Sequence, residues 1–229
     1  MRNFWKYLTR VHRWAGLVLG VQITLWFASG FFMSFFDINT VRGRHIAEKQ
    51  DAVLTVEADM IAPQTLFHEG ELHSVSLRAV LGEPLYVLSG DAGEDYIHAR
   101  TGEPWKALGE TSIRLAAQTY YKGEGEIAST RKLDIAPIEY RGPLPVWQVT
   151  FNDGPATRLY LDPNTAELKS VRTRLWRAFD FMWMLHIMDY KGRDNINTWW
   201  LKLFSGAALL FAFSGVALVV QRVFLRPKA

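Results

Sequence analysis

Cysteine is absent from all 229 residues. Its absence excludes disulfides, thiolate metal sites, iron–sulfur clusters and the covalent attachment of c-type haem. The chain also lacks a nucleophile elbow, a Walker loop, an H-E-x-x-H pair and a G-x-G-x-x-G turn, so nothing in it points to an autonomous hydrolase or kinase, and no metal site is predicted. Charge is missing from two long stretches near the ends, and these stretches indicate the class of protein.

The two uncharged stretches are long enough to cross a bilayer. Residues 15–36 carry no charge over 22 positions, and residues 203–220 form an apolar run of 18 that continues outward through Trp199, Trp200 and Leu201. At 1.5 Å per residue, a helix of about 20 residues spans the hydrocarbon core of roughly 30 Å. The first run is too long for a signal peptide, and no A-x-A-like site follows it. Both runs therefore predict transmembrane helices.

Basic residues flank both predicted helices, and no acidic residue accompanies them. Four lie before the first helix and three follow the second: Arg2, Lys6, Arg10 and Arg13, then Arg222, Arg226 and Lys228. The net charge of +3 leaves 3 − 7 = −4 for the rest of the chain, which argues against nucleic-acid binding. The positive-inside rule predicts that both termini are cytoplasmic and that the middle domain lies outside the cytoplasm, in a bacterial inner membrane.

The middle of the chain shows one order of elements twice, which predicts a duplicated α+β domain. The first unit has strand patterns near 74–79, 85–89 and 95–99 after a short helix near 63–68. The second has a helix at 111–121 and strands near 128–135, 146–151 and 157–161. Each final hairpin ends in a polar turn and a glutamate, Glu103 in one unit and Glu167 in the other. We therefore expect each helix to cover one face of an antiparallel sheet.

A further helix is predicted at 173–190, with Leu175, Trp176, Phe179, Trp183 and Ile187 on one side. It is too short and too charged to span, so we expect it to lie in the membrane interface. The predicted divisions are a cytoplasmic flank (1–14), a transmembrane helix (15–36), the duplicated domain (37–172), the interfacial helix and its turn (173–198), a second transmembrane helix (199–221) and a cytoplasmic tail (222–229).

Three segments resemble the PepSY and PepSY-associated transmembrane proteins. The ending L-Y-L-D-P-N-T-A-E-L at 159–168 resembles the close of a PepSY domain, while H-R-W-A-G-L at 12–17 and Leu185-His186 with Ser214-Gly215 resemble the membrane parts. The resemblance implies two PepSY-like helix-plus-sheet units, each with an antiparallel sheet, anchored by two transmembrane helices. The larger reductases of the family have about four spans where this chain has two.

His12 and His186 are the candidate cofactor ligands, because each lies at the membrane edge of an apolar segment. Related membrane proteins use histidines at such places to bind b-type haem. The predicted topology puts about 30 Å of hydrocarbon between the two, so one chain is not expected to clamp one haem with both. The alternative is that both histidines are interfacial anchors without a cofactor.

Three functions remain open on the sequence. The first is a membrane-anchored accessory or binding component of an inner-membrane assembly, linked to electron transfer or to iron and siderophore handling. The second is a transmembrane reductase that binds haem b as an oligomer through His12 and His186. The third is a peptidase-regulating module. All three place the chain in the lipid bilayer with a membrane-protein partner or a further copy of itself, and none involves nucleic acid.

Overall fold

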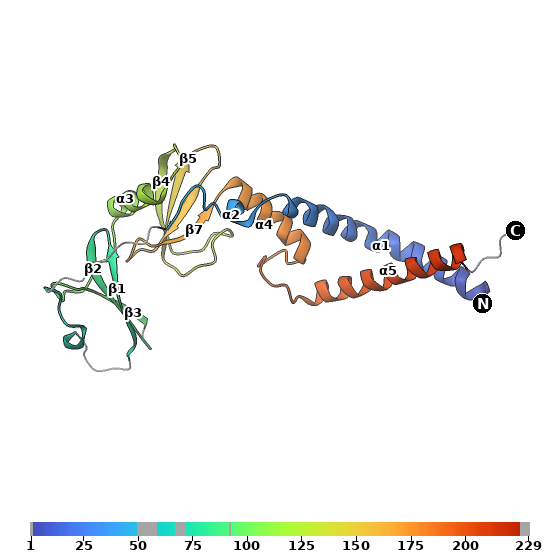
Figure 1. Cartoon of the computed structure of the whole chain (residues 1–229), viewed down its shortest axis with the longest axis horizontal. Coiled ribbons are helices and arrows are strands. Elements are labelled where there is room, and N and C mark those ends of the chain that lie inside the picture. Colours follow the sequence, from blue (N-terminus) through green and yellow to red (C-terminus); the bar gives the residue numbers. More distant parts are fainter. Residues whose placement is uncertain (1, 50–58, 67–71, 92, 225–229) are drawn as a thin grey trace. The chain divides into compact units, whose positions relative to one another are not determined.

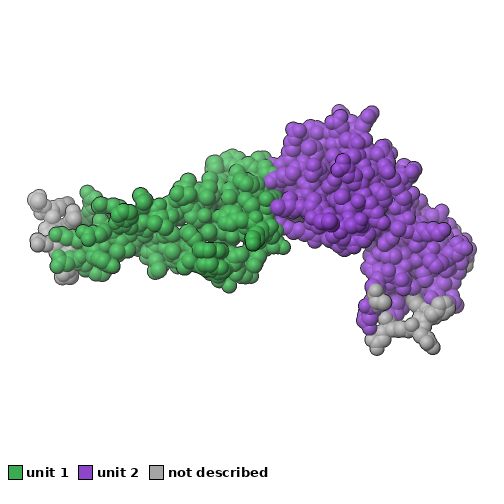
Figure 2. All heavy atoms as spheres, turned by 180° about the vertical axis from the view of Figure 1, so that it is seen from behind, with its two compact units in different colours: residues 1–37, 178–229 green, residues 38–177 purple. Residues whose placement is uncertain are grey.

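The computed structural model describes residues 2–49, 59–66, 72–91 and 93–224. They divide into two compact units, one of residues 1–37 and 178–229 and one of residues 38–177 (Figure 2). Residues 67 and 68 of the predicted short helix, and Arg226 and Lys228 of the predicted cytoplasmic tail, lie outside the described residues.

The first unit contains the two apolar helices that the sequence predicts. Helix α1 covers Arg2–Ser34 and helix α5 covers Trp199–Phe224, and the two pack side by side (Figure 1). Their apolar side chains point mostly outward: Leu17 is 71% exposed and Leu210 is 71% exposed. Mean hydropathy reaches 1.6 in α1 and 2.3 in α5. Lengths of 33 and 26 residues suit a bilayer, where lipid tails cover such side chains.

The second unit holds two antiparallel sheets and confirms the α+β class. The strands of the first sheet are β1 (Leu72–Val80), β2 (Glu83–Gly90) and β3 (Gly93–His98), in that order. Those of the second are β4 (Glu126–Leu133), β5 (Val146–Asn152), β6 (Arg158–Leu161) and β7 (Leu168–Arg172), again in sequence order. Short helices α2 (Ile38–Val41) and η1 (Pro63–Thr65) precede the first sheet, and α4 (Arg174–Ile187) follows the second.

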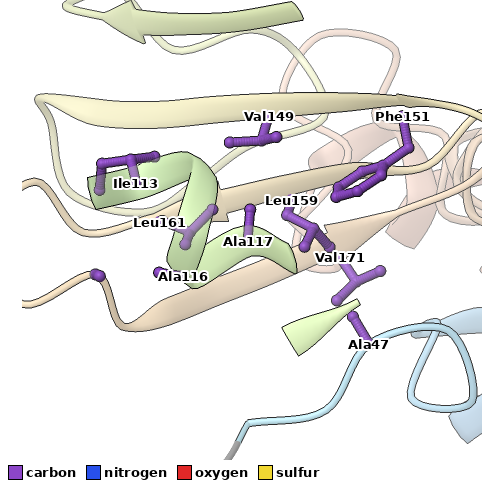
Figure 3. Close-up of a cluster of buried hydrophobic side chains, with 10 residues drawn as sticks. Ala47, Ile113, Ala116, Ala117, Val149, Phe151, Leu159, Leu161 and Val171 are labelled. Carbon is purple, nitrogen blue, oxygen red and sulfur yellow. The ribbon is translucent and has the colours of Figure 1, made fainter. Parts of the chain in front are cut away.

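The main core lies between α3 (Glu110–Tyr120) and the second sheet, as the spacing of apolar residues predicts. Ile113, Ala116 and Ala117 share one face of α3 and are almost fully buried. They pack over the sheet residues Val149, Phe151, Leu159, Leu161 and Val171 (Figure 3). Two alanines on the buried face let the helix backbone approach the sheet closely.

The turns that close the two sheets have the same hydrogen bonds. In the second turn, the Asp162 side chain accepts hydrogen bonds from the backbone N–H groups of Asn164 and Thr165, at 2.9 and 3.0 Å. In the first, His98 Nδ1 accepts from the N–H groups two and three residues later, at 3.2 and 3.3 Å. Each turn also joins its first N–H to the carbonyl of its closing glutamate, at 2.9 Å from His98 and 3.0 Å from Asp162.

Helix α2 and strand β7 are not among the elements that the sequence pattern predicts. The register between β6 and β7 shifts between Tyr160 and Leu161, so the apolar residues of β7 do not alternate along the strand. The first sheet has only a remnant at the equivalent place, a single bridge between Ile97 and Pro104. In both sheets, the segment after the turn therefore pairs with the strand before it. This pairing is a single bridge in the first sheet and a full strand, β7, in the second.

We expect Gly43→Ala to destabilise the second unit. Gly43 has a φ of +72°, and a Cβ there would lie 2.6 Å from Val171 Cγ1. Strain and overlap together are expected to cost about 2–3 kcal/mol, seen as a lower Tm in near-UV circular dichroism of the detergent-solubilised chain. Gly82→Ala is the matched control, since Gly82 has a φ of +89° but nothing within 4 Å of its Cβ position. Equal losses in the two variants would contradict the clash.

Candidate functional site

His12 lies on α1 and is held against α5. Its Nδ1 atom is 2.6 Å from the hydroxyl oxygen of Ser214, and its ring stacks on Phe211 with centroids 4.3 Å apart and planes 2° from parallel. Gly215 makes room for the imidazole, because a Cβ at that position would lie 3.2 Å from the His12 Cε1 atom. A serine and a glycine on α5 therefore form the seat of the ring.

His186 has the same kind of seat at another place in the unit. It lies in the last turn of α4, with Nδ1 3.0 Å from the hydroxyl oxygen of Ser29 on α1. Gly30 follows Ser29, and a Cβ on Gly30 would lie 3.5 Å from the His186 Cε1 atom. Ser29 is fully buried. Both candidate histidines thus rest on a Ser-Gly pair of a transmembrane helix.

The serines determine which nitrogen of each ring carries the hydrogen. A serine hydroxyl has one hydrogen, and Ser214 donates it to the Phe211 carbonyl at 2.7 Å, while Ser29 donates to the Leu25 carbonyl at 2.6 Å. Both serine oxygens are therefore left as acceptors, so each imidazole must donate from Nδ1. This network assigns the Nδ1–H tautomer to both histidines. In the neutral ring, Nε2 then carries the lone pair, and Nε2 is the nitrogen that is free to bind a metal.

The two histidines stand far apart. His12 and Ser29 are separated by 29 − 12 = 17 residues of the same helix, which corresponds to about 25 Å along its axis. His186 contacts Ser29, so its ring lies close to that level. The structure does not bring the two imidazoles together, and any ligand that they hold is held at two sites.

The family model described as PepSY-associated TM region matches residues 9–228. The chain belongs to this family. Both Ser-Gly seats and both histidines fall within the matched range, together with the intervening sheets. Membership and the two apolar helices make the chain a membrane protein. No curated protein and no solved structure matches it.

Sequence reasoning missed the Ser29-Gly30 seat of this PepSY-associated protein. Its partner His186 is 157 positions away, and no local pattern joins them. One signal was present: the dipeptide Ser-Gly occurs in both apolar runs, at 29–30 in the first and at 205–206 and 214–215 in the second. Two small residues in succession permit close approach of another side chain or helix in a membrane.

A buried ion pair fixes the segment that precedes α5. Asp180 of α4 accepts a hydrogen bond from Arg193 Nη1 at 2.7 Å, and Trp183 Nε1 donates to the Arg193 carbonyl at 3.1 Å. The Asp189 side chain accepts hydrogen bonds from the backbone N–H groups of Asn195 and Gly192. These hydrogen bonds, the one from Asn195 most of all, lower the pKa of its carboxyl. The turn between α4 and α5 is thus built around two aspartates, one paired and one capped by backbone.

Glu139 is a buried carboxylate of the second unit that binds three side chains. Its side chain is 5% exposed and accepts hydrogen bonds from Tyr160 at 2.7 Å, Arg158 at 2.8 Å and Arg177 at 3.0 Å. Burial by itself would raise the pKa of this carboxyl, but the three donors outweigh burial and hold the pKa below its usual value. Arg172 adds a bond to the Glu139 carbonyl at 2.6 Å. Glu139 therefore ties the β4–β5 connection to the start of α4.

A second charged cluster surrounds Glu167 and joins the two sheets. Glu167 pairs with Lys49, with Lys169 at 3.0 Å and with Arg78 of β1 at 3.2 Å. Burial raises the pKa of this carboxyl, whereas the hydrogen bonds from Lys49 and Lys169 lower it to a net value of about 2. Within the described ranges, no three metal-ligating side chains converge on one point. Both carboxylate clusters join segments of the second unit that are distant in the sequence.

Proposed function

We propose that this chain is the membrane-anchored component of an electron-transfer assembly in which His12 and His186 would each hold a b-type haem. The tautomer that the serines impose supports the proposal, because each imidazole has its lone pair on Nε2. A hydrogen-bond acceptor on Nδ1–H is the usual companion of a metal-bound histidine. A b-type haem bound at these nitrogens would carry single electrons between its ferric and ferrous states.

The residues around each ring fit such a group. Gly215 and Gly30 lie against the imidazole rings, and among the described residues neither Nε2 atom has a hydrogen-bond partner. Without cysteine, haem cannot be attached through thioethers, which favours the non-covalent b type. Ser29 and Ser214 fix the ring orientation from the opposite side.

Two sites about 25 Å apart require ligands from a second chain. If each haem takes two imidazoles, one chain provides one at each site, and a second copy of the chain provides the other. A dimer would then hold two haems, one at the level of His12 and one at the level of His186. The two together would form a path for electrons along the membrane normal. We therefore infer a homo-oligomer rather than a self-sufficient monomer.

The outer domain serves in this proposal as the recognition module. The matching turns at His98 and Asp162, with the same pattern of backbone hydrogen bonds, support two PepSY-like units that arose by duplication. Resemblance to the reductases of the family suggests an iron–siderophore complex or a redox protein as the partner of this module. An accessory component without haem would keep the same domain and lose the path for electrons.

Topology sets the direction of that path, and both termini are expected in the cytoplasm of a bacterial inner membrane. Seven basic residues flank the two helices with no acidic residue beside them. At either terminus, a reporter enzyme that works only in the cytoplasm should be active. After Asp91, a reporter that works only outside the cytoplasm should be active. A terminus found outside the cytoplasm would reverse the assignment of His12 and His186 to the two faces.

Ser214→Ala is expected to weaken haem binding at the His12 site roughly 10–100-fold without abolishing it. The change removes the acceptor that holds His12 Nδ1–H, so the ring can rotate and change tautomer. Titration of haem into the apoprotein, followed at the Soret band, would measure the loss. Ser205→Ala is the matched control, since Ser205 lies exposed on the same helix. Equal affinities for the two variants would remove Ser214 from the site.

The absorption spectrum of the purified chain tests the function directly. A Soret band that sharpens on reduction with dithionite, together with a low-spin spectrum, is expected of imidazole-ligated haem. Protein that is folded and dimeric but carries no haem after growth with added haem precursor would overturn the proposal. The chain would then be an accessory component of a membrane assembly that binds no haem.

A further inference from the structure

The connection between β4 and β5 exposes an unusual amount of aliphatic surface. Within residues 134–145, Ile135 is 84% exposed, Ile138 57% and Leu144 41%. Single exposed aliphatic residues are common on soluble proteins, but three in one loop of twelve residues give that loop an apolar surface of its own. Three prolines, Pro137, Pro143 and Pro145, accompany them.

Contacts of Glu139 and Tyr140 hold the loop in place, while its aliphatic side chains point outward. Glu139 and Tyr140 point inward and are 4% and 3% exposed. Tyr140 stacks on Tyr160 with centroids 4.6 Å apart and donates a hydrogen bond to the Pro143 carbonyl at 3.1 Å. The Glu139 carboxylate and carbonyl bind three arginines. Glu139 and Tyr140 thus form a held base of the loop, and Ile135, Ile138 and Leu144 form its exposed apolar tip.

Charge around the tip is mainly basic. Residues 131–145 contain three basic side chains, Arg131, Lys132 and Arg141, all of them exposed. Of the two acids in this range, Glu139 is buried and neutralised by arginines, which leaves only Asp134 exposed. A surface that combines exposed isoleucine with an excess of lysine and arginine matches the boundary between anionic headgroups and acyl chains.

Chain connectivity brings a bilayer to this loop. Glu139 accepts a hydrogen bond from Arg177, the fourth residue of α4, and α4 continues without a break into the unit that contains the membrane helices. Ile138 is adjacent to Glu139, and Ile135 is four residues away, at most about 14 Å. The same chain therefore supplies a lipid surface at high effective concentration, whereas a protein partner would have to associate at a cost in free energy.

We propose that residues 134–145 form an interfacial foot that seats the outer domain on the anionic bilayer surface. Ile135, Ile138 and Leu144 enter the boundary between headgroups and acyl chains, and Arg131, Lys132 and Arg141 bind lipid phosphates. The foot would keep the outer domain close to the membrane, and it stands independently of any haem. A protein partner or a second copy at the same patch is the competing outcome.

The absence of cysteine makes a direct test possible in the full-length chain. Ile135→Cys and Ile138→Cys, each carrying a nitroxide label, are reconstituted alone into vesicles of phosphatidylcholine and phosphatidylglycerol. Collision of each label with oxygen and with a water-soluble nickel complex is then measured. Leu115→Cys on α3 is the matched control, because Leu115 is 58% exposed and Ile138 57%.

We expect the ratio of oxygen to nickel collisions to be several-fold higher for both loop labels than for the Leu115 label, and to fall in vesicles of phosphatidylcholine alone. Ratios equal to that of Leu115 would overturn the foot. Labels shielded from both reagents, with broadening from a second label nearby, would overturn it in favour of contact between two copies. Equal ratios in the two kinds of vesicle would overturn the role given to the basic residues.

Discussion

Replacing His186 by alanine is expected to remove about half of the haem bound by the purified protein, and His12→Ala to remove the other half. Each histidine serves a different site, because the two lie about 25 Å apart along α1. Both copies in the dimer carry the substitution, so the haem at that site loses both of its imidazoles and is expected to dissociate. Haem content and the low-spin signal in electron paramagnetic resonance would measure the change, and the double variant should retain neither.

Controls separate ligation from packing. His73→Ala removes an exposed histidine of β1 that pairs with Asp91, and should leave haem content unchanged. Membrane insertion of the His186 variant should also be unaffected, since one neutral imidazole contributes little to the insertion free energy of these helices. If His186→Ala and His12→Ala each left the haem content of the wild type intact, neither histidine would be a ligand.

Glu139→Ala is expected to reduce the free energy of unfolding of the outer domain by about 2–4 kcal/mol at pH 7. The change leaves Arg158 and Arg177 without their carboxylate, but these side chains are 39% and 29% exposed, so water recovers part of the loss. The loop that presents Ile135 and Ile138 also loses the side-chain hydrogen bonds of Glu139 to Arg158 and Arg177, while the bond from Arg172 to the Glu139 carbonyl remains. Urea unfolding followed by near-UV circular dichroism would measure the effect.

The Glu139 carboxylate also makes the stability of the outer domain depend on pH in the acid range. The pKa of Glu139 is lowered in the folded state, so its contribution to stability is present above the unfolded pKa of about 4.3 and is lost as pH falls through the folded pKa. Glu139→Gln should therefore flatten the fall of stability below about pH 4. Glu126→Gln, at an exposed position of β4, is the control. An unchanged acid limb in the Glu139 variant would contradict the account of this cluster.

The sequence predicts much of the fold because its strongest signals are local. Uncharged length identifies α1 and α5, and the spacing of Ile113, Ala116 and Ala117 identifies the buried face of α3. Hairpin turns place most strands of both sheets. Strand β7 escapes because a register shift breaks its alternation.

The sites are harder to predict because they join distant segments. His12 and His186 stand out by their place at the ends of apolar runs, but their partners Ser214 and Ser29 are 202 and 157 positions away. Likewise, nothing near Glu139 in the sequence identifies Arg158 and Arg177 as its partners. Side chains that meet only through the fold leave no periodic pattern, so a structure is needed to pair them.

Haem stoichiometry is the most direct test of the central claim that the two Ser-Gly seats hold metal-binding imidazoles. The full chain, purified in mild detergent from cells supplied with haem precursor, is assayed for haem b by the pyridine haemochrome method and for protein by amino-acid analysis. Two sites shared by two chains predict about one haem per chain, bound with two imidazoles. A dimeric, folded preparation with no bound haem would contradict the claim, and would leave His12 and His186 as hydrogen-bonded ties between helices.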